Sequence, residues 1–428
     1  MRLSPNPFTF GSPVRGVAFL DRRQALRRVG NMLRHGGSAV VSAEPRTGKT
    51  SLLLYLQEQA ADLFGSEAAA WAFRYLDGHT FSGWDVPRFW RAVLRPLREG
   101  ALGAVAQEAY AQAEGHEFDA QALEDLFHAL QAAGQCLVLM LDEFDAVLDE
   151  PGLHHQRFYG PLRSLASRYP SFALAIATRR SITDLNTATR AFAAGSPYFN
   201  FAEEVPLPPF PQRDVDALLK RAGDAFTPQD RAFLRRVAGG HPYFLQVAAY
   251  YLWEEHHLAD ETGRSPEEQR VAAAKEAFAQ AKNTLADTWQ AWTPAMRLAF
   301  TLVALEHVPT LLEGRTFDME KLKAQLALLR PELAKLARLG FLRVHPDAAS
   351  GYEPEAEIML WYLVDELTRL LRTEVEDLGA WLTAQEWDGL LTKGEKEALK
   401  RGLLQAGRLL LKVAHDITPL IQALVSRS

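Results

Sequence analysis

The sequence predicts an α/β protein, with a parallel sheet between layers of helices in its first half and a helical second half. The first indication is two apolar runs, Cys136–Leu141 and Phe172–Ala177, which lack the polar alternation of a half-exposed strand. Parallel strands covered on both faces have this pattern. The second is that helical patterns separate the strand candidates, as the crossovers of a parallel sheet require. The third is a change to a purely helical pattern after Pro208 and Pro209.

The elements of the first half follow from short runs and their flanking residues. Four strands and a weaker fifth candidate are expected at Ser38–Ser42, Ala70–Leu76, Cys136–Leu141, Phe172–Ala177 and Glu203–Leu207. Helical spacing predicts the intervening helices at Arg22–Leu33, Ser51–Phe64, Val86–Leu97, Leu102–Ala113 and Ala120–Ala133. Gly134 follows the last of these and is a candidate C-cap.

The second half is predicted to be helical, with one interruption by short extended segments. The expected helices are Arg213–Ala222, Pro228–Val237, Tyr243–Glu255, Glu267–Trp289, Pro294–Leu305, Met319–Leu328, Pro331–Leu339, Ala356–Arg372 and Gly394–Leu424. Two short extended runs, residues 340–344 and 352–354, follow three of these helices and suggest a winged helix.

Composition excludes several classes of protein. The net charge of −6 is mild, so any basic surface would have to be local. The single cysteine, Cys136, excludes a disulfide framework within the chain and fits a reducing compartment. The N-terminus has no apolar core of a signal peptide, and no uninterrupted apolar stretch reaches the roughly 20 residues of a membrane helix. We therefore expect a cytoplasmic protein without a membrane span.

The strongest motif is the segment Ala43–Thr50, which lies between an expected strand and an expected helix. In this context the backbone N–H groups cradle phosphates, Lys49 neutralises them and the Thr50 hydroxyl binds Mg²⁺. We therefore predict that the chain binds ATP and Mg²⁺. A chance Gly-Lys-Thr turn is the alternative, which the strand–loop–helix context disfavours. The residues expected at the phosphates are Pro45, Arg46, Thr47, Gly48, Lys49, Thr50 and Ser51.

One position departs from the usual pattern, because Ala43 stands where a glycine begins most such loops. An alanine costs little there if its φ is negative and more if its φ is positive.

Two carboxylates follow the apolar run that ends at Leu141. The carboxyl end of a buried parallel strand is where α/β sheets bind ligands. Asp142 is expected to hold the magnesium, and Glu143 to act as general base on the attacking water. Acidic residues at a helix N-terminus are the alternative, and this alternative suits Asp145 better than the Asp142–Glu143 pair.

Two arginines follow the fourth strand, after Thr178. Arg179, or secondly Arg180, is expected to reach the γ-phosphate and to report its presence or stabilise the transition state. Two solvated loop arginines are an equally good interpretation of either residue alone.

Taken in order, these motifs resemble the prokaryotic AAA-like branch of the STAND and ORC-like P-loop ATPases. The resemblance covers residues 6–370, and its motifs are weak singly but specific together. They are Asn6-Pro7-Phe8, Gly11-x-Pro13-Val14, Phe19–Arg22, Pro45–Leu53, Leu141–Asp145, Gly195–Asn200 and Gly239–Gln246.

The resemblance implies a P-loop NTPase core with a parallel five-stranded sheet, a helical lid and a winged helix. On this basis the domains are residues 1–207 (core), 208–290 (lid), 291–372 (winged helix) and 373–428 (a helical tail). Phe19 and Arg22 would line the adenine pocket, and Pro242 would pack near adenine. From the residues alone, His241 and Pro242 fit equally well as the start of a helix.

The resemblance also implies an ATP-hydrolysing switch with slow turnover, in which ATP holds lid and core together. The family's Met-His-Asp motif, a repeat sensor and an effector domain are not found in the sequence, so we expect a separate protein partner or self-association.

One alternative is a DNA-associated loader or remodeller. However, residues 292–368 hold eight Lys or Arg and eleven Asp or Glu, a net charge of 8 − 11 = −3, which does not support nucleic-acid binding. Another alternative is a nucleotide-binding scaffold with negligible turnover.

Overall fold

The computed structural model describes residues 5–20, 22–192, 197–313, 319–373, 375–413 and 417–426. The chain divides into two compact units. The sheet unit comprises Pro13–Glu44 and Gly48–Leu207, and the helical unit comprises Met1–Ser12, Pro45–Thr47 and Pro208–Ser428.

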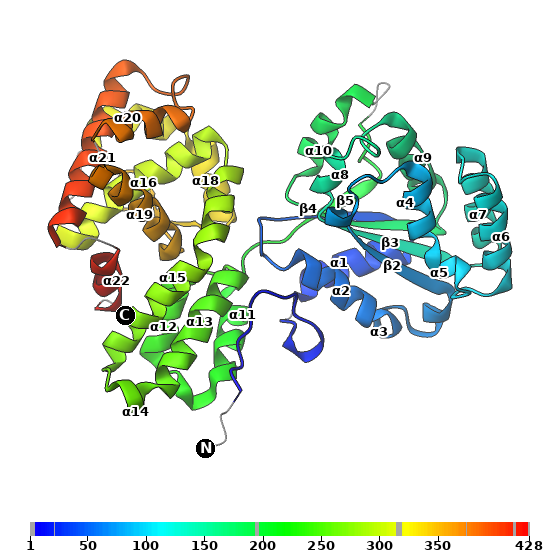
Figure 1. Ribbon diagram of the computed structural model, residues 1–428, viewed down its shortest axis with the longest axis horizontal. Coiled ribbons are helices and arrows are strands. Elements are labelled where there is room, and N and C mark those ends of the chain that lie inside the picture. The colour runs from blue at the N-terminus through cyan, green and yellow to red at the C-terminus, as the bar shows by residue number, and fades with distance from the viewer. Residues whose placement is uncertain are drawn as a thin grey trace. The chain divides into compact units, whose positions relative to one another are not determined.

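The sheet unit contains a five-stranded parallel sheet, which confirms the predicted fold class (Figure 1). The strand order is β2-β3-β4-β1-β5, and every neighbouring pair is parallel. The strands are β1 (Ser38–Ser42), β2 (Trp71–Asp77), β3 (Cys136–Asp142), β4 (Phe172–Thr178) and β5 (Ala202–Pro206). The fifth candidate is therefore an edge strand, paired with β1.

Helices cover both faces of this sheet, which explains why its central strands are apolar throughout. Every residue of β3 and β4 is buried. The helices of this unit are α1 (Arg23–Arg34), α2 (Lys49–Glu58), α3 (Ala60–Phe64), α4 (Val86–Val93), α5 (Arg95–Arg98), α6 (Ala104–Gly115), α7 (Ala120–Ala132), α8 (Asp145–Leu148), α9 (Gln156–Arg168) and α10 (Ile182–Ala188).

Alternate residues of β3 separate two hydrophobic cores. Val138 and Met140 pack in the core that includes residues of α1 and α2, whereas Leu137 and Leu139 pack in the core that includes residues of α4, α7 and α9. This alternation is the two-residue period of a strand. It places Asp142, two residues after Met140, on the face of the sheet covered by α2.

The sequence pattern and the observed helices differ at several points in this unit. The helix expected at Ser51–Phe64 is divided into α2 and α3, and the helix expected at Val86–Leu97 is divided into α4 and α5. In the second case Pro96 lies in the first turn of α5, where the missing N–H of proline costs nothing. Helix α9, between β3 and β4, and helix α10, between β4 and β5, were not predicted from the pattern.

The helical unit begins with α11 (Gln212–Leu219), α12 (Pro228–Ala238), α13 (Pro242–His257), α14 (Ala259–Thr262) and α15 (Pro266–Ala291). They are followed by α16 (Pro294–Glu313), α17 (Lys323–Leu328), α18 (Arg330–Arg338), the antiparallel strands β6 (Leu342–Val344) and β7 (Tyr352–Pro354), and α19 (Glu357–Thr373). The winged helix and the four-part domain division stay predictions.

The last part of the helical unit contains α20 (Val375–Ala384), α21 (Lys393–Val413) and α22 (Thr418–Val425). A single helix over Gly394–Leu424 was expected; instead, two helices lie in this range, and residues 414–416 between them are outside the described part of the chain.

Among the described residues, one helix is long and apolar enough to cross a membrane, namely Pro294–Leu312 within α16. Of its apolar window, 78% is buried within the protein, as is typical of the core helix of a folded domain.

A buried ionic cluster fixes three helices of this unit to one another. The Asp230 side chain is 1% exposed and caps the start of α12 through Thr227. Its carboxylate also lies 3.2 Å from Nε2 of His256 in α13 and 3.3 Å from Arg270 in α15. Burial acts to raise the pKa of Asp230, but the hydrogen bonds from His256 and Thr227 outweigh it, and the pKa lies below its ordinary value.

Candidate functional site

The loop after β1 has the backbone of a phosphate-binding loop. Gly48 is the N-cap of α2 with φ of 97°, a left-handed conformation that favours glycine. Arg46 also has a positive φ of 60°, whereas Ala43 is not among the residues with positive φ. The alanine at the start of the loop is therefore unstrained, and the departure from the usual glycine costs little.

Lys49 lies at the start of α2 and is 5% exposed. Its Nζ donates hydrogen bonds to the carbonyl oxygens of Ala43 and Glu44, each at 3.0 Å. Burial lowers the pKa of Lys49, and nearby Arg179 acts in the same direction, while the carboxylates of Glu143, Asp142 and Asp145 oppose it. A phosphate group at this position would supply the negative charge that a buried ammonium requires.

Asp142 ends β3 and is 2% exposed. Its Oδ1 accepts a hydrogen bond of 3.0 Å from the Glu143 N–H, and its Oδ2 accepts one of 2.8 Å from the Tyr75 hydroxyl. Burial raises the pKa of Tyr75, and the charge of Asp142 adds to this effect, so the hydroxyl stays protonated and donates. The carboxylate of Asp142 is thus held from two sides.

Glu143 has φ of 45°, an unusual value for a residue with a side chain. Such a backbone costs about 1–3 kcal/mol and clusters at functional sites. The chain turns sharply here, directly after the buried strand, and enters α8 at Asp145.

Asp145 connects the end of β3 to the end of β4. Its Oδ2 accepts hydrogen bonds from the Thr178 hydroxyl at 2.9 Å and from the Arg179 N–H at 2.8 Å. Its Oδ1 lies 3.3 Å from Nε of Arg180. Nε of Arg179 lies 4.0 Å from Oε2 of Glu143. The structure therefore places Arg179 beside the expected general base and pairs Arg180 with Asp145.

The strand order brings these groups to one edge. Strands β1 and β3 both pair with β4. The loop after β1, Asp142 at the end of β3 and Thr178 at the end of β4 therefore lie at the carboxyl ends of three adjacent strands. Lys49 lies within electrostatic range of Glu143, Arg179, Asp142 and Asp145. Ligands of α/β proteins bind at this edge.

The chemistry of the site fits a magnesium ion bound together with a nucleotide. Asp142 is a buried carboxylate, and in the described part of the chain no Lys or Arg forms an ion pair with it. The Thr50 hydroxyl and the Asp142 carboxylate are the hard oxygen ligands that Mg²⁺ prefers. No group of three or more His, Cys, Asp or Glu among the described residues could hold a metal. A magnesium ion here would therefore need phosphate oxygens as further ligands, as is usual for Mg²⁺.

The expected adenine-pocket residues are in two different units. In the sheet unit Phe19 stacks on Tyr55 with ring centroids 4.2 Å apart, and Arg22 is 9% exposed. In the helical unit Pro242 is the first residue of α13, as expected for a helix start. Ser51, expected at the phosphates, accepts a hydrogen bond of 3.1 Å on its hydroxyl from the Val14 N–H. Three residues of the quoted motifs, Asp21, Gly195 and Ser196, are outside the described residues.

Sequence reasoning missed Tyr75 as part of the site. Tyr75 could have been found from the two-residue period of β2. Asp77 pairs with Asp142 in the sheet, so Tyr75, two residues before Asp77, lies on the same face of the sheet. The adjacent histidines after α8 are not part of the site: a ring nitrogen of His154 lies 2.9 Å from the Tyr159 hydroxyl, and one of His155 lies 2.9 Å from the Gly152 carbonyl oxygen.

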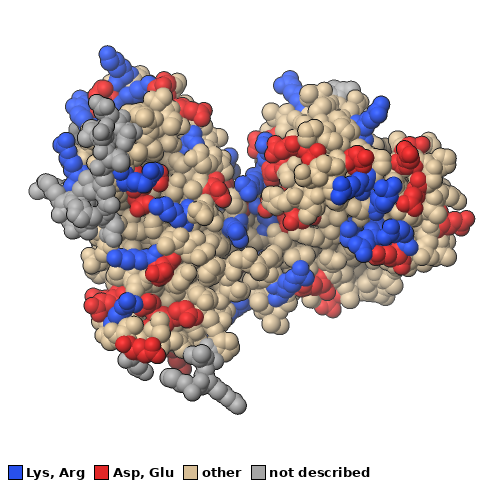
Figure 2. All heavy atoms as spheres, viewed as in Figure 1, with Lys and Arg blue, Asp and Glu red and all other residues tan. Residues whose placement is uncertain are grey.

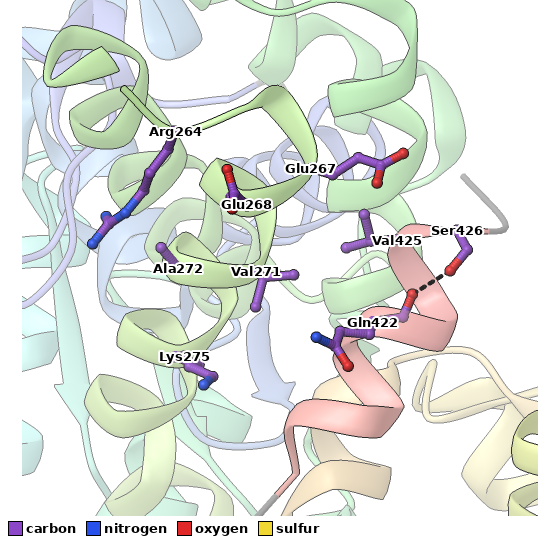
Figure 3. A pocket seen from close by; sticks show the side chains of 9 residues that line it. All are labelled: Arg264, Glu267, Glu268, Val271, Ala272, Lys275, Gln422, Val425 and Ser426. Carbon is purple, nitrogen blue, oxygen red and sulfur yellow. Dashed lines mark hydrogen bonds between the residues drawn. The ribbon is translucent and has the colours of Figure 1, made fainter. Parts of the chain in front are cut away.

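A separate surface groove of about 500 Å³ lies in the helical unit, between the start of α15 and the end of α22 (Figure 3). Two of its charged side chains already have local partners: Arg264 lies 2.6 Å from Glu255, and Glu268 caps α15 at Ser265. The groove contains none of the expected site residues. Its lining residues are Arg264, Glu267, Glu268, Val271, Ala272, Lys275, Gln422, Val425 and Ser426.

Several solved structures are similar to this chain at low sequence identity. The Walker-type ATPase of Pyrococcus abyssi is 14% identical with a TM-score of 0.49, and the match covers 83% of this chain and 99% of that chain. The Aeropyrum pernix ORC2 protein, solved as ADPNP–ADP complexes, is 15% identical with a TM-score of 0.46, over 79% and 92%. A STAND protein of Pyrococcus horikoshii with a tetratricopeptide repeat sensor is 14% identical with a TM-score of 0.36, over 95% and 55%.

No curated protein matches the sequence. The family model described as the AAA-like domain matches residues 12–263, which is more than half of the chain and includes the whole of the site described above. This match shows that the chain belongs to the AAA-like domain family.

Proposed function

We propose that this protein is a regulatory switch that binds ATP, hydrolyses it slowly to ADP and phosphate, and signals to a separate protein or to a second copy of itself. The observation that carries the proposal is the surroundings of Lys49. A buried ammonium lies at the start of a helix, within range of carboxylates and an arginine that come from other strands. Few arrangements other than a triphosphate site require these groups together.

The residues would act as follows. The N–H groups at the start of α2 and the Lys49 ammonium bind the phosphates, and Lys49 exchanges its two carbonyl partners for phosphate oxygens. Thr50 and Asp142 would hold a magnesium ion, which neutralises charge on the phosphates. Glu143 takes the proton from the attacking water. Arg179, close to Glu143, contacts the γ-phosphate while it is present.

A switch requires contacts that exist in one nucleotide state only. Arg179 can supply such a contact, because Asp145 holds its backbone to the turn after β3 while its side chain is 43% exposed. Loss of the γ-phosphate would release this side chain. A partner protein would then detect the released Arg179 side chain. We propose defence or stress signalling as the biological setting, on the ground of family resemblance alone.

Two measurements test this proposal on the full chain. The first is the mass in solution with and without a non-hydrolysable ATP analogue and Mg²⁺, where we expect a nucleotide-dependent change in assembly or partner binding. The second is steady-state phosphate release by wild type and by Glu143→Gln, where we expect the variant to be about 100-fold slower or more. Equal background rates for both proteins, with nucleotide still bound, would identify a scaffold instead.

A DNA-associated ATPase is the other candidate, and the described charges do not favour it. Arg343 on β6 lies 2.7 Å from Glu353 and 3.6 Å from Glu355, so it is already paired. Basic and acidic side chains are interspersed on the face seen in Figure 2. DNA affinity depends strongly on phosphate neutralisation. Phosphate release that rises with added duplex DNA and falls with salt would overturn the switch in favour of this candidate.

A further inference from the structure

The neighbouring strand β2 and the residue directly after it contact the carboxylate turn at one point each. The Tyr75 hydroxyl donates a hydrogen bond of 2.8 Å to Oδ2 of Asp142. Three residues later, Gly78 packs so closely that a Cβ there would lie 2.3 Å from the Glu143 carbonyl oxygen and 3.1 Å from that of Asp142.

The register of the sheet explains why these two residues reach the turn. Tyr75 pairs with Met140, and Asp77 pairs with Asp142. Tyr75 and Asp142 therefore lie on one face of the sheet as diagonal neighbours, a separation that an aromatic side chain can span. Gly78 comes directly after the last residue of β2, where the chain packs against the turn.

The hydrogen bonds of Asp142 leave room for a metal ligand. Each carboxylate oxygen accepts one hydrogen bond, from the Glu143 N–H or from Tyr75, and each can accept a second interaction. With both oxygens held, the carboxylate cannot rotate about its Cβ–Cγ bond without losing a bond in a buried site. Such outer partners orient a metal-binding carboxylate before the metal arrives.

We propose that Tyr75 is a positioning residue for Mg²⁺-nucleotide binding, which orients Asp142, and that Gly78 is needed to let the Glu143 turn lie against β2. This inference rests on the proposed function, since it concerns the same phosphate site. It assigns a role to the edge strand β2, which contributes no residue to the phosphate loop or to the acidic pair.

The test is Tyr75→Phe in the full chain, because phenylalanine keeps the ring and removes only the hydroxyl. The probe is Mn²⁺ in the presence of a non-hydrolysable ATP analogue, followed by electron paramagnetic resonance, with nucleotide affinity in EDTA measured separately by calorimetry. We expect the dissociation constant for Mn²⁺ to rise about 10- to 100-fold, while affinity for the analogue in EDTA stays within about 2-fold of wild type.

The matched control is Tyr110→Phe, which removes another tyrosine–carboxylate hydrogen bond of the sheet unit, 3.0 Å from Tyr110 to Glu114. It should leave Mn²⁺ binding unchanged. A second test is the double variant Tyr75→Phe with Asp142→Asn: if Tyr75 acts through Asp142, its substitution should add nothing to the loss that Asp142→Asn causes by itself. An additive loss would overturn the proposal.

The outcomes separate this inference from the proposed function. If wild type binds no nucleotide, the proposed function fails. If wild type binds Mn²⁺ and nucleotide, but Tyr75→Phe binds Mn²⁺ equally well, the inference alone fails. A Tyr75→Phe chain that does not fold would show that the hydroxyl is a structural anchor, and this result also overturns the inference.

Gly78 is tested by Gly78→Ala. A methyl group there must displace the Glu143 carbonyl, so phosphate release should fall about 10-fold or more, with affinity for the analogue in EDTA unchanged. Gly115→Ala is the control, because a Cβ at Gly115 meets nothing within 4 Å. Wild-type turnover by Gly78→Ala would overturn this half of the proposal.

Discussion

Replacing Lys49 by alanine tests the phosphate site most directly. The ammonium is 5% exposed and donates two hydrogen bonds of 3.0 Å, to Ala43 and Glu44. When phosphate oxygens replace these carbonyls, the lysine becomes half of a buried charge pair, and truncating such a partner costs about 3–4 kcal/mol. The dissociation constant for ATP should therefore rise roughly 100- to 1,000-fold, since each factor of ten is about 1.4 kcal/mol.

The same geometry predicts that the empty protein tolerates this change. Burial lowers the pKa of Lys49, which means that the fold disfavours its charge. Removing the ammonium relieves that cost and loses two hydrogen bonds of about 1 kcal/mol each, so the unfolding free energy should change by no more than about 2 kcal/mol.

Calorimetric titration with an ATP analogue measures the first effect, and urea unfolding measures the second. Lys282→Ala is the matched control, since Lys282 forms a partly exposed pair with Asp365 in the helical unit. An affinity of Lys49→Ala within about 3-fold of wild type would refute the phosphate site, because no buried ammonium could then be facing phosphate.

Ala43→Gly should leave ATP affinity unchanged in the same titration and cost at most about 1 kcal/mol in urea unfolding, because φ at Ala43 is not positive; a marked gain in affinity would contradict this. Asp145→Ala frees the Arg179 N–H and Arg180, so phosphate release should fall about 10-fold with analogue affinity retained. Loss of affinity with unchanged turnover would be the contrary result. Asp230→Asn should lower the unfolding free energy by about 3 kcal/mol, since it breaks a buried ionic cluster. Because the folded pKa of Asp230 lies below the ordinary 3.8, the advantage of wild type is present above about pH 4 and is lost as the pH falls through the folded pKa; an advantage that persisted at lower pH would contradict this reasoning.

Much of the sheet unit could be predicted from local patterns. The strand expected at Ser38–Ser42 is β1 without change, and the strand expected at Phe172–Ala177 is one residue shorter than β4. Both are buried runs of apolar or small residues. Burial of a strand on two faces of the sheet can therefore be recognised from the residue types in the sequence. The break between α4 and α5 at Leu94 and the helix α9 were harder to predict. Whether a short helix forms depends on tertiary packing as much as on the spacing of its apolar residues.

The candidate site divides in the same way. Lys49 and Asp142 were predicted because each belongs to a short motif next to an apolar strand. The hydrogen bond that the Ser51 hydroxyl accepts from the Val14 N–H was not predicted, because it joins residues that are distant in the sequence. Whether Ala43 is strained could not be decided either, since φ at that position depends on how the loop leaves the sheet.

By itself the sequence determined the class of fold, the phosphate-binding motif and the acidic pair after β3, because these depend on residue types and spacings within a few turns of chain. Only the tertiary structure decided that β4 lies between β1 and β3, that Asp145 holds the Arg179 backbone, and that Tyr75 reaches Asp142. Strand order and register join residues that are tens of positions apart, and they are set by the packing of both faces of the sheet at once.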